Sequence, residues 1–93
     1  MVSNPISREV FFMETPRIKV GGYYELKVRD NRTIAFAVMY GFKDGKNKGV
    51  YALMMYTPEK VFEFPVHESL FAQWADEGKV REITSDEAFA YIV

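Results

Sequence analysis

The stretch TIAFAVMYGF, residues 33–42, has the strongest strand character in the chain and sets the expected fold. Side chains of a strand alternate between two faces, and here both sets are apolar. One set is Ile34, Phe36, Val38, Tyr40 and Phe42, and the other is Ala35, Ala37, Met39 and Gly41. We therefore predict a central strand covered on both faces. The small residues of the second set leave room for a large neighbour, and Trp74 is the expected one.

Three further strands are predicted around this one. Residues 23–28 alternate, with Tyr24, Leu26 and Val28 on the apolar face. The other two strands are apolar runs at 50–56 and 61–66, and polar turns at 29–32, 43–49 and 57–60 separate the four. Because short turns join antiparallel neighbours, this order predicts a meander. Pro65 indicates that the last strand lies at an edge of the sheet.

Two helices are predicted after the strands. Residues 68–77 carry Leu70, Phe71 and Trp74 at helical spacing and end before a glycine. Residues 84–87 (TSDE) match a capping box, which predicts a short helix from there to about residue 91. Residues 6–13 suit either a strand or a helix, and we favour a strand.

The predicted fold is a single α+β domain spanning residues 1–93. It is a small antiparallel β-meander or half-open barrel of four to five strands, with one or two C-terminal helices packed on one face. Apolar residues make up 48% of the chain and charged residues 27%, which is an ordinary globular balance.

Composition excludes several classes of protein. The chain has no cysteine, which excludes a disulfide framework, thiolate catalysis and zinc sites that need Cys ligands. No signal-peptide pattern and no apolar run near the roughly 20 residues of a membrane helix is present, so we expect a soluble, cytoplasmic protein that does not bind membranes.

No pattern of catalytic or metal-ligating residues stands out. His67 is the single histidine, and Glu68 beside it would point in a different direction on a helix, so the two are poor co-ligands. His67 and Ser69 are not accompanied by an oxyanion motif, and the glycines lack the spacing of phosphate-binding loops. We expect no cofactor, no metal and no enzymatic activity.

Charge is distributed unevenly along the chain. Residues 1–49 hold nine Lys and Arg against five Asp and Glu, whereas residues 50–93 hold three against eight. The meander brings many of these cations, with several tyrosines, to one end of the sheet, where they would form a basic rim suited to an anionic ligand. The candidate binding residues are Arg17, Lys19, Tyr23, Tyr40, Lys43, Lys46, Lys48, Tyr51 and His67. A lysine-rich hairpin loop that is simply solvated would give the same pattern.

Two functions are consistent with these features. The first is a small regulator or inhibitor that contacts a protein partner, a profile typical of accessory proteins of bacteria or their phages. The alternative is a binder of a nucleotide or single-stranded nucleic acid through the basic rim. A homodimer could form in either case, through the edge strand at 61–66 or the strand expected at 6–13.

Overall fold

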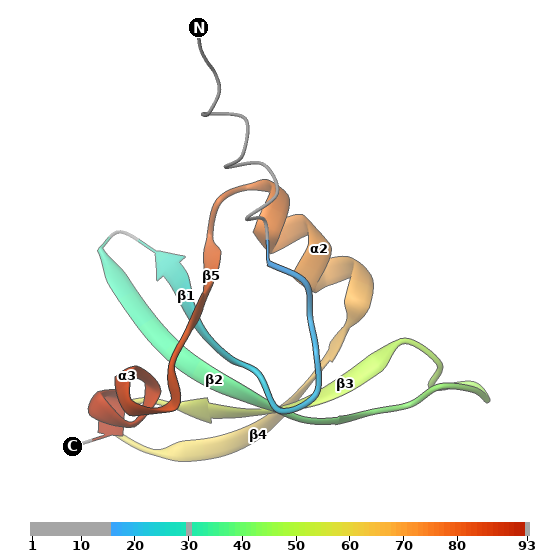
Figure 1. Ribbon diagram of the computed structural model, residues 1–93, viewed down its shortest axis with the longest axis horizontal. Helices are drawn as coiled ribbons and strands as arrows, with labels where there is room; N and C mark the ends of the chain where they lie inside the picture. Colours follow the sequence, from blue (N-terminus) through green and yellow to red (C-terminus); the bar gives the residue numbers. More distant parts are fainter. Residues whose placement is uncertain (1–15, 30, 93) are drawn as a thin grey trace, which may run out of the picture.

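The computed structural model describes residues 16–29 and 31–92, which form one sheet and three short helical segments (Figure 1). The strands are β1 (Tyr23–Arg29), β2 (Arg32–Gly41), β3 (Val50–Tyr56), β4 (Val61–His67) and β5 (Val80–Ile83). The helices are α2 (Glu68–Asp76), α3 (Ser85–Phe89) and the 3-10 helix η1 (Ala90–Ile92). The sheet is open, with the order β4-β3-β2-β1-β5 and antiparallel pairing throughout. The element predicted at 6–13 lies outside the described residues.

The predicted fold class is confirmed, because the first four strands form an antiparallel meander and the helices follow them. β4 is an edge strand, as Pro65 indicates. The Glu68 amide donates to the Gly49 carbonyl at 2.7 Å, which fixes the alternation of bonded and non-bonded pairs along β3 and β4. Pro65 falls opposite Ala52 in a non-bonded pair, so its missing N–H costs no sheet hydrogen bond.

The sequence does not predict β5, whose four residues are too few to show a strand pattern. Pairing with β1 makes it a strand: Tyr23 lies opposite Ile83 and Leu26 opposite Val80. The Lys27 amide extends this ladder by donating to the Lys79 carbonyl at 2.8 Å. Tertiary pairing, rather than local propensity, therefore sets this element.

The main core lies between the sheet and α2. Phe71 of α2 contacts Tyr24 and Phe36, with ring centroids 5.1 and 6.3 Å apart. Trp74 packs on the same core, its ring centroid 6.2 Å from that of Phe36. The expectation that Trp74 covers the alanine face is wrong. Residues three apart share one face of a helix, so Trp74 must lie on the side of the sheet that Phe71 covers.

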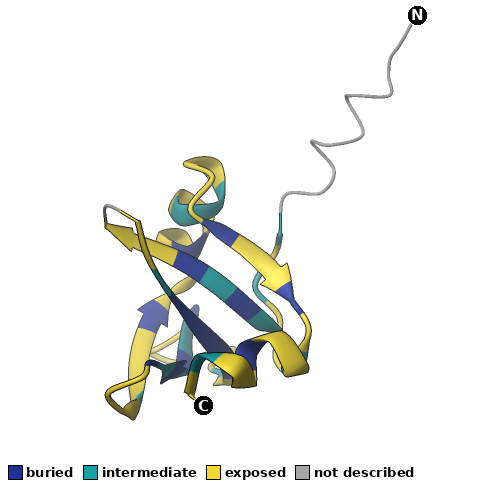
Figure 2. Cartoon of the chain, turned by 90° about the vertical axis from the view of Figure 1, so that its left-hand side faces the viewer, coloured by how far each residue is buried: buried dark blue, intermediate teal, exposed yellow. Residues whose placement is uncertain are grey.

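α3 and η1 cover the opposite face, where the alanines of β2 lie. Ala35 and Ala88 are fully buried there, and the rings of Tyr23, Tyr56 and Tyr91 pack around them. The small side chains do admit large neighbours, but these are tyrosines. The helices α2 and α3 thus pack on opposite faces of the sheet, whereas the sequence suggests that the helices pack on one face. Burial follows this arrangement: β2 and β3 are buried along their middle, whereas β4 is largely exposed (Figure 2).

A β-bulge in β2 reverses the faces of its last residues. Val38 pairs with Leu53 but Tyr40 pairs with Ala52, so Met39 is an extra residue on β2. Strict alternation places Tyr40 and Phe42 beside Phe36, and that expectation is wrong beyond Val38. The extra residue turns both aromatic side chains to the α3 face.

A second irregularity lies at the end of β1. Lys27 pairs with Thr33 but Arg29 pairs with Arg32, which makes Val28 an extra residue on β1. Val28 is 42% exposed, unlike Tyr24 and Leu26, and it lines a hollow with Ile34 and Phe62.

Tyr24 ties the segment before β1 to the core. Its hydroxyl donates to the Arg17 carbonyl at 2.7 Å and accepts from the Lys19 amide at 3.2 Å. Burial raises the pKa of Tyr24 to about 12, and the Lys19 amide opposes this by stabilising the phenolate. The hydroxyl therefore stays protonated and holds residues 17–19 against the sheet.

Candidate functional site

The predicted basic rim corresponds to one end of the sheet, but its side chains do not converge there. Val50 pairs with His67, and the Gly21 amide donates to the Val38 carbonyl at 2.9 Å, so the relevant strand ends are adjacent as expected. β2 and β3 then continue past the start of β1 as a projecting hairpin (Figure 1). This projection carries the loop lysines away from the cations near β1.

The nine candidate residues are distributed over several places. Arg17, Tyr51 and His67 line one pocket beside α2. Lys43, Lys46 and Lys48 are exposed in the hairpin loop, and Tyr40 lies on the α3 face. Tyr23 packs edge-on against Phe89, and Lys19 forms an ion pair with Glu82 at 2.9 Å. Ligand binding by these residues as one set stays a prediction.

The pocket beside α2 has a volume of about 530 Å³ and a largely apolar lining. Ile18, Tyr51 and Phe71 contribute to this lining. Among its charged groups, the Glu68 carboxylate accompanies the Arg17 guanidinium, so the pocket is not uniformly positive. Its chemistry suits a small amphipathic molecule and does not select an anion.

His67 has a structural task at the start of α2. Its Nδ1 accepts a hydrogen bond from the Ser69 amide at 3.0 Å and thereby caps the helix. The Ser69 hydroxyl lies 2.9 Å from the same nitrogen. Since Nδ1 is committed to the cap, the His67–Ser69 pair does not have the arrangement of a general base with a nucleophile, which also requires a third group to orient the base.

The bulge at Met39 creates an aromatic surface on the projecting hairpin. We define the hairpin patch as the lining of a hollow of about 270 Å³: Tyr40, Phe42, Val50, Ala52, Glu63 and Pro65. Tyr40 and Phe42 pack edge to face with their centroids 5.6 Å apart, yet they remain 49% and 41% exposed. The Tyr40 hydroxyl points to the Glu63 carboxylate, 3.5 Å away.

Lysines follow the patch along the chain. Lys43, Lys46 and Lys48 are exposed, and none of them forms an ion pair with another described residue. By contrast, Lys19, Arg32, Lys79 and Arg81 each have a carboxylate partner. The hairpin therefore combines exposed aromatic surface with lysines that have no ion-pair partner among the described residues.

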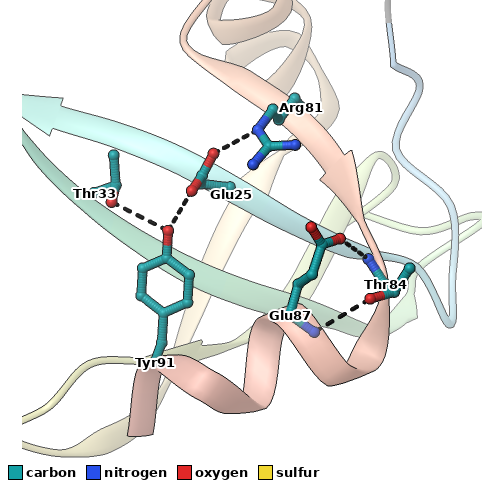
Figure 3. Close-up of polar contacts among 6 residues, drawn as sticks. All are labelled: Glu25, Thr33, Arg81, Thr84, Glu87 and Tyr91. Carbon is teal, nitrogen blue, oxygen red and sulfur yellow. Dashed lines mark hydrogen bonds and ion pairs between the residues drawn. The ribbon is translucent and has the colours of Figure 1, made fainter.

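A polar network on the α3 face fixes η1 to the sheet (Figure 3). We name it the Tyr91 clamp; its members are Glu25, Thr33, Arg81 and Tyr91. The Tyr91 hydroxyl donates to the Glu25 carboxylate and lies 3.1 Å from the Thr33 hydroxyl. Arg81 donates to the other Glu25 oxygen at 2.6 Å. The clamp joins β1, β2, β5 and η1, and no residue spacing in the sequence predicts it.

The clamp shifts the pKa values of Glu25, Arg81 and Tyr91, and the hydrogen bond to Glu25 raises that of Arg81. The hydrogen bond from Tyr91 lowers the pKa of Glu25, and the Arg81 guanidinium adds to this against the effect of burial. Burial raises the pKa of Tyr91, and its hydrogen bond to the Glu25 carboxylate raises that pKa further. At neutral pH Glu25 is therefore a carboxylate and Tyr91 a neutral phenol, and this pair serves a structural role in holding η1 on the sheet.

Within residues 16–29 and 31–92, no helix is long and apolar enough to cross a membrane. The same part of the chain contains no cluster of three or more His, Asp or Glu side chains placed to hold a metal ion. Comparison of the chain with protein-family models, with curated proteins and with solved structures finds no match.

Proposed function

We propose that the protein is a non-enzymatic binding protein that regulates or inhibits a larger protein by docking through the hairpin patch. The observation that supports this most directly is the bulge at Met39. It turns Tyr40 and Phe42 out of the main core, where strict alternation would bury them, and holds them half-exposed on a projecting hairpin. Bulges are frequent next to functional sites, where they re-aim side chains.

A partner would gain appreciably by covering this surface. Fully burying one large apolar side chain contributes about 1.5–3 kcal/mol, and each of the two rings has close to half of its surface left to bury. Aromatic residues are also enriched among the side chains that dominate binding energy at protein interfaces. The two rings and Pro65 form the apolar centre of the proposed interface.

The hairpin lysines define the chemistry of the partner. Lys43, Lys46 and Lys48 lie in the loop that continues from Phe42, so a partner segment over the patch would pass close to them. We propose that this segment carries one apolar side chain for the hollow and acidic residues beside it. Complementary charge would raise the association rate and select against basic partners.

Selection of peptides tests this proposal. Random peptides are displayed against the immobilised protein, and the enriched peptides are expected to combine an apolar residue with neighbouring Asp or Glu. A synthetic peptide of that sequence should then bind Phe42→Ser at least about tenfold more weakly than wild type, as expected for the loss of a central interface residue.

Phe64→Ser is the matched control, because Phe64 is 43% exposed but pairs with Leu53 on the α2 face of β4. Its affinity for the peptide should stay within about twofold of wild type, since it lies outside the patch. Absence of any enriched peptide, enrichment of basic peptides, or an equal loss in the two variants would each refute the proposal.

A further inference from the structure

A basic hollow lies at the other end of the sheet, between the β1–β2 turn and the β3–β4 turn. Its volume is about 310 Å³, and it shares no residue with the hairpin patch. Its lining is Val28, Arg29, Arg32, Ile34, Thr57, Glu59, Lys60 and Phe62. The three cationic side chains and one carboxylate leave an excess of two positive charges above an apolar floor.

The positions of Arg29 and Arg32 destabilise the protein when no ligand is bound. Arg29 and Arg32 are direct partners across the β1–β2 ladder. Like charges in such positions repel each other and destabilise the pairing. The bulge at Val28 produces this arrangement, because in a regular ladder Val28 would pair with Arg32 and Arg29 would lie on the α3 face with Lys27. A bound anion between the guanidinium groups would remove the repulsion.

The other contacts hold the cations in position before any ligand arrives. Lys60 is fixed by two hydrogen bonds with the Thr57 side chain: its carbonyl accepts from the hydroxyl at 2.8 Å, and its amide donates to that oxygen at 3.1 Å. The Lys60 ammonium lies 4.9 Å from the centroid of the Phe62 ring. Arg32 donates to Glu59 at 3.3 Å. Groups held in this way lose less entropy on binding.

We infer that the basic hollow binds a small phosphate monoester that carries an apolar or aromatic group. A monoester has a charge of about −1.5 to −2 at neutral pH, which matches the excess of two positive charges. Guanidinium groups donate two parallel hydrogen bonds to phosphate oxygens, which favours phosphate recognition by Arg29 and Arg32. The apolar group would lie on Ile34 and Phe62. This inference does not depend on the proposed docking function.

Titration with phenyl phosphate tests the inference. Calorimetry should show saturable binding to the full chain, and the backbone amide signals of Arg29, Arg32 and Lys60 should shift in NMR spectra. Inorganic phosphate, which lacks the ring, and phenol, which lacks the charge, should each bind more weakly. Arg29→Gln should weaken phenyl phosphate binding about tenfold or more, the effect of one charged hydrogen-bonding group.

Two matched measurements separate this site from general attraction to positive charge. Lys46→Gln removes the same charge from the hairpin loop and should leave the affinity within about twofold, because exposed charges more than about 10 Å apart are screened. Arg29→Gln should also leave the melting temperature of the free protein unchanged or raised, while the stabilisation by phenyl phosphate is lost. No saturable binding, equal weakening by both substitutions, or full binding by Arg29→Gln would each overturn the inference.

Discussion

Replacing Tyr91 by Phe isolates the hydrogen bonds of the Tyr91 clamp. The substitution keeps the ring that packs against Ala35 and Ala88 and removes only the hydroxyl. That hydroxyl is the donor to Glu25 and the partner of Thr33. Any loss of stability then reports the clamp and not the apolar packing of η1.

The expected loss follows from the surroundings of the Glu25 carboxylate. A hydrogen bond to a charged group contributes about 1.5–3 kcal/mol when it is well shielded from water. The Glu25 side chain is 22% exposed and keeps its bond to Arg81, so the lower part of that range applies. We expect Tyr91→Phe to lower the free energy of unfolding by about 1–2 kcal/mol, roughly 5–10 °C in Tm for a chain of this length.

The loss should also depend on pH in a defined direction. The pKa of Glu25 is lower in the folded protein than its ordinary value of 4.5, and the bond from Tyr91 is the largest cause. The folded state therefore binds this proton less tightly than the unfolded state. The resulting stability is complete above pH 4.5 and disappears as the pH falls through the lowered pKa. The difference between wild type and Tyr91→Phe should shrink accordingly in acid.

Urea unfolding at pH 7 and at pH 3 measures both effects. Tyr40→Phe is the control, because the Tyr40 hydroxyl is exposed and only 3.5 Å from its carboxylate, and its change should stay within about 0.5 kcal/mol. A double-mutant cycle with Glu25→Gln then gives the coupling energy of the pair. This role of the Tyr91 hydroxyl is refuted if Tyr91→Phe lowers the free energy of unfolding no more than Tyr40→Phe does at pH 7, or if its effect is the same at both pH values.

Two further substitutions test the core and the hairpin. Tyr24 has an ordinary pKa of 10 and a folded pKa of about 12, so its stabilising effect is complete below pH 10 and is lost as the pH rises through 12. Unfolding titrations of the wild type should therefore show an alkaline loss of up to about 3 kcal/mol in the free energy of unfolding, which Tyr24→Phe should lack. If the stability of Tyr24→Phe fell with pH as steeply as that of the wild type, Tyr24 would not be the group responsible. Gly45 and Gly49 both have positive φ, 81° and 87°, but only at Gly49 would an added Cβ meet a neighbour, 2.8 Å from Nε2 of His67. Thermal unfolding should therefore show that Gly45→Ala lowers the free energy of unfolding by about 1 kcal/mol and Gly49→Ala by at least about 2 kcal/mol. Equal losses in the two variants would mean that the His67 ring moves aside without cost.

The strands that the sequence predicts correctly are those with local signals. Residues 50–56 and 61–66 are apolar runs between polar turns, and both become strands at those positions. The capping box at Thr84 is present with both of its reciprocal hydrogen bonds. These features depend on neighbours in the chain, which is why a single sequence is sufficient to find them.

The errors concern contacts between distant parts of the chain. β5 becomes a strand by pairing with β1, and the face that Trp74 covers is decided by how α2 packs after β4. The Tyr91 clamp joins Glu25 to Arg81 and Tyr91, which lie 56 and 66 positions further along the chain. No periodicity encodes such separations, so pattern reasoning could not supply them.

The sequence predicts which strand ends lie together, but not where the side chains at those ends point. The shared end of the meander is correct, but pattern reasoning assumed that every strand alternates without interruption. One extra residue, Met39, sends Tyr40 and Phe42 to the α3 face, and another, Val28, sends Arg29 beside Arg32. The first produces the hairpin patch and the second the basic hollow.

Both bulges act against stability, and this supports a functional reading of the two surfaces. In a regular ladder Met39 would pair with Ala52, and Tyr40 and Phe42 would continue the buried row of Ile34, Phe36 and Val38, whereas the bulge leaves the two rings half-exposed. In a regular ladder Val28 would pair with Arg32, and Arg29 would not face another arginine. Selection for the most stable sheet would favour regular pairing over these bulges, because burial of apolar surface and separation of like charges both favour the regular ladder. Departures from local rules that carry such a cost are expected where side chains must meet a ligand or a partner.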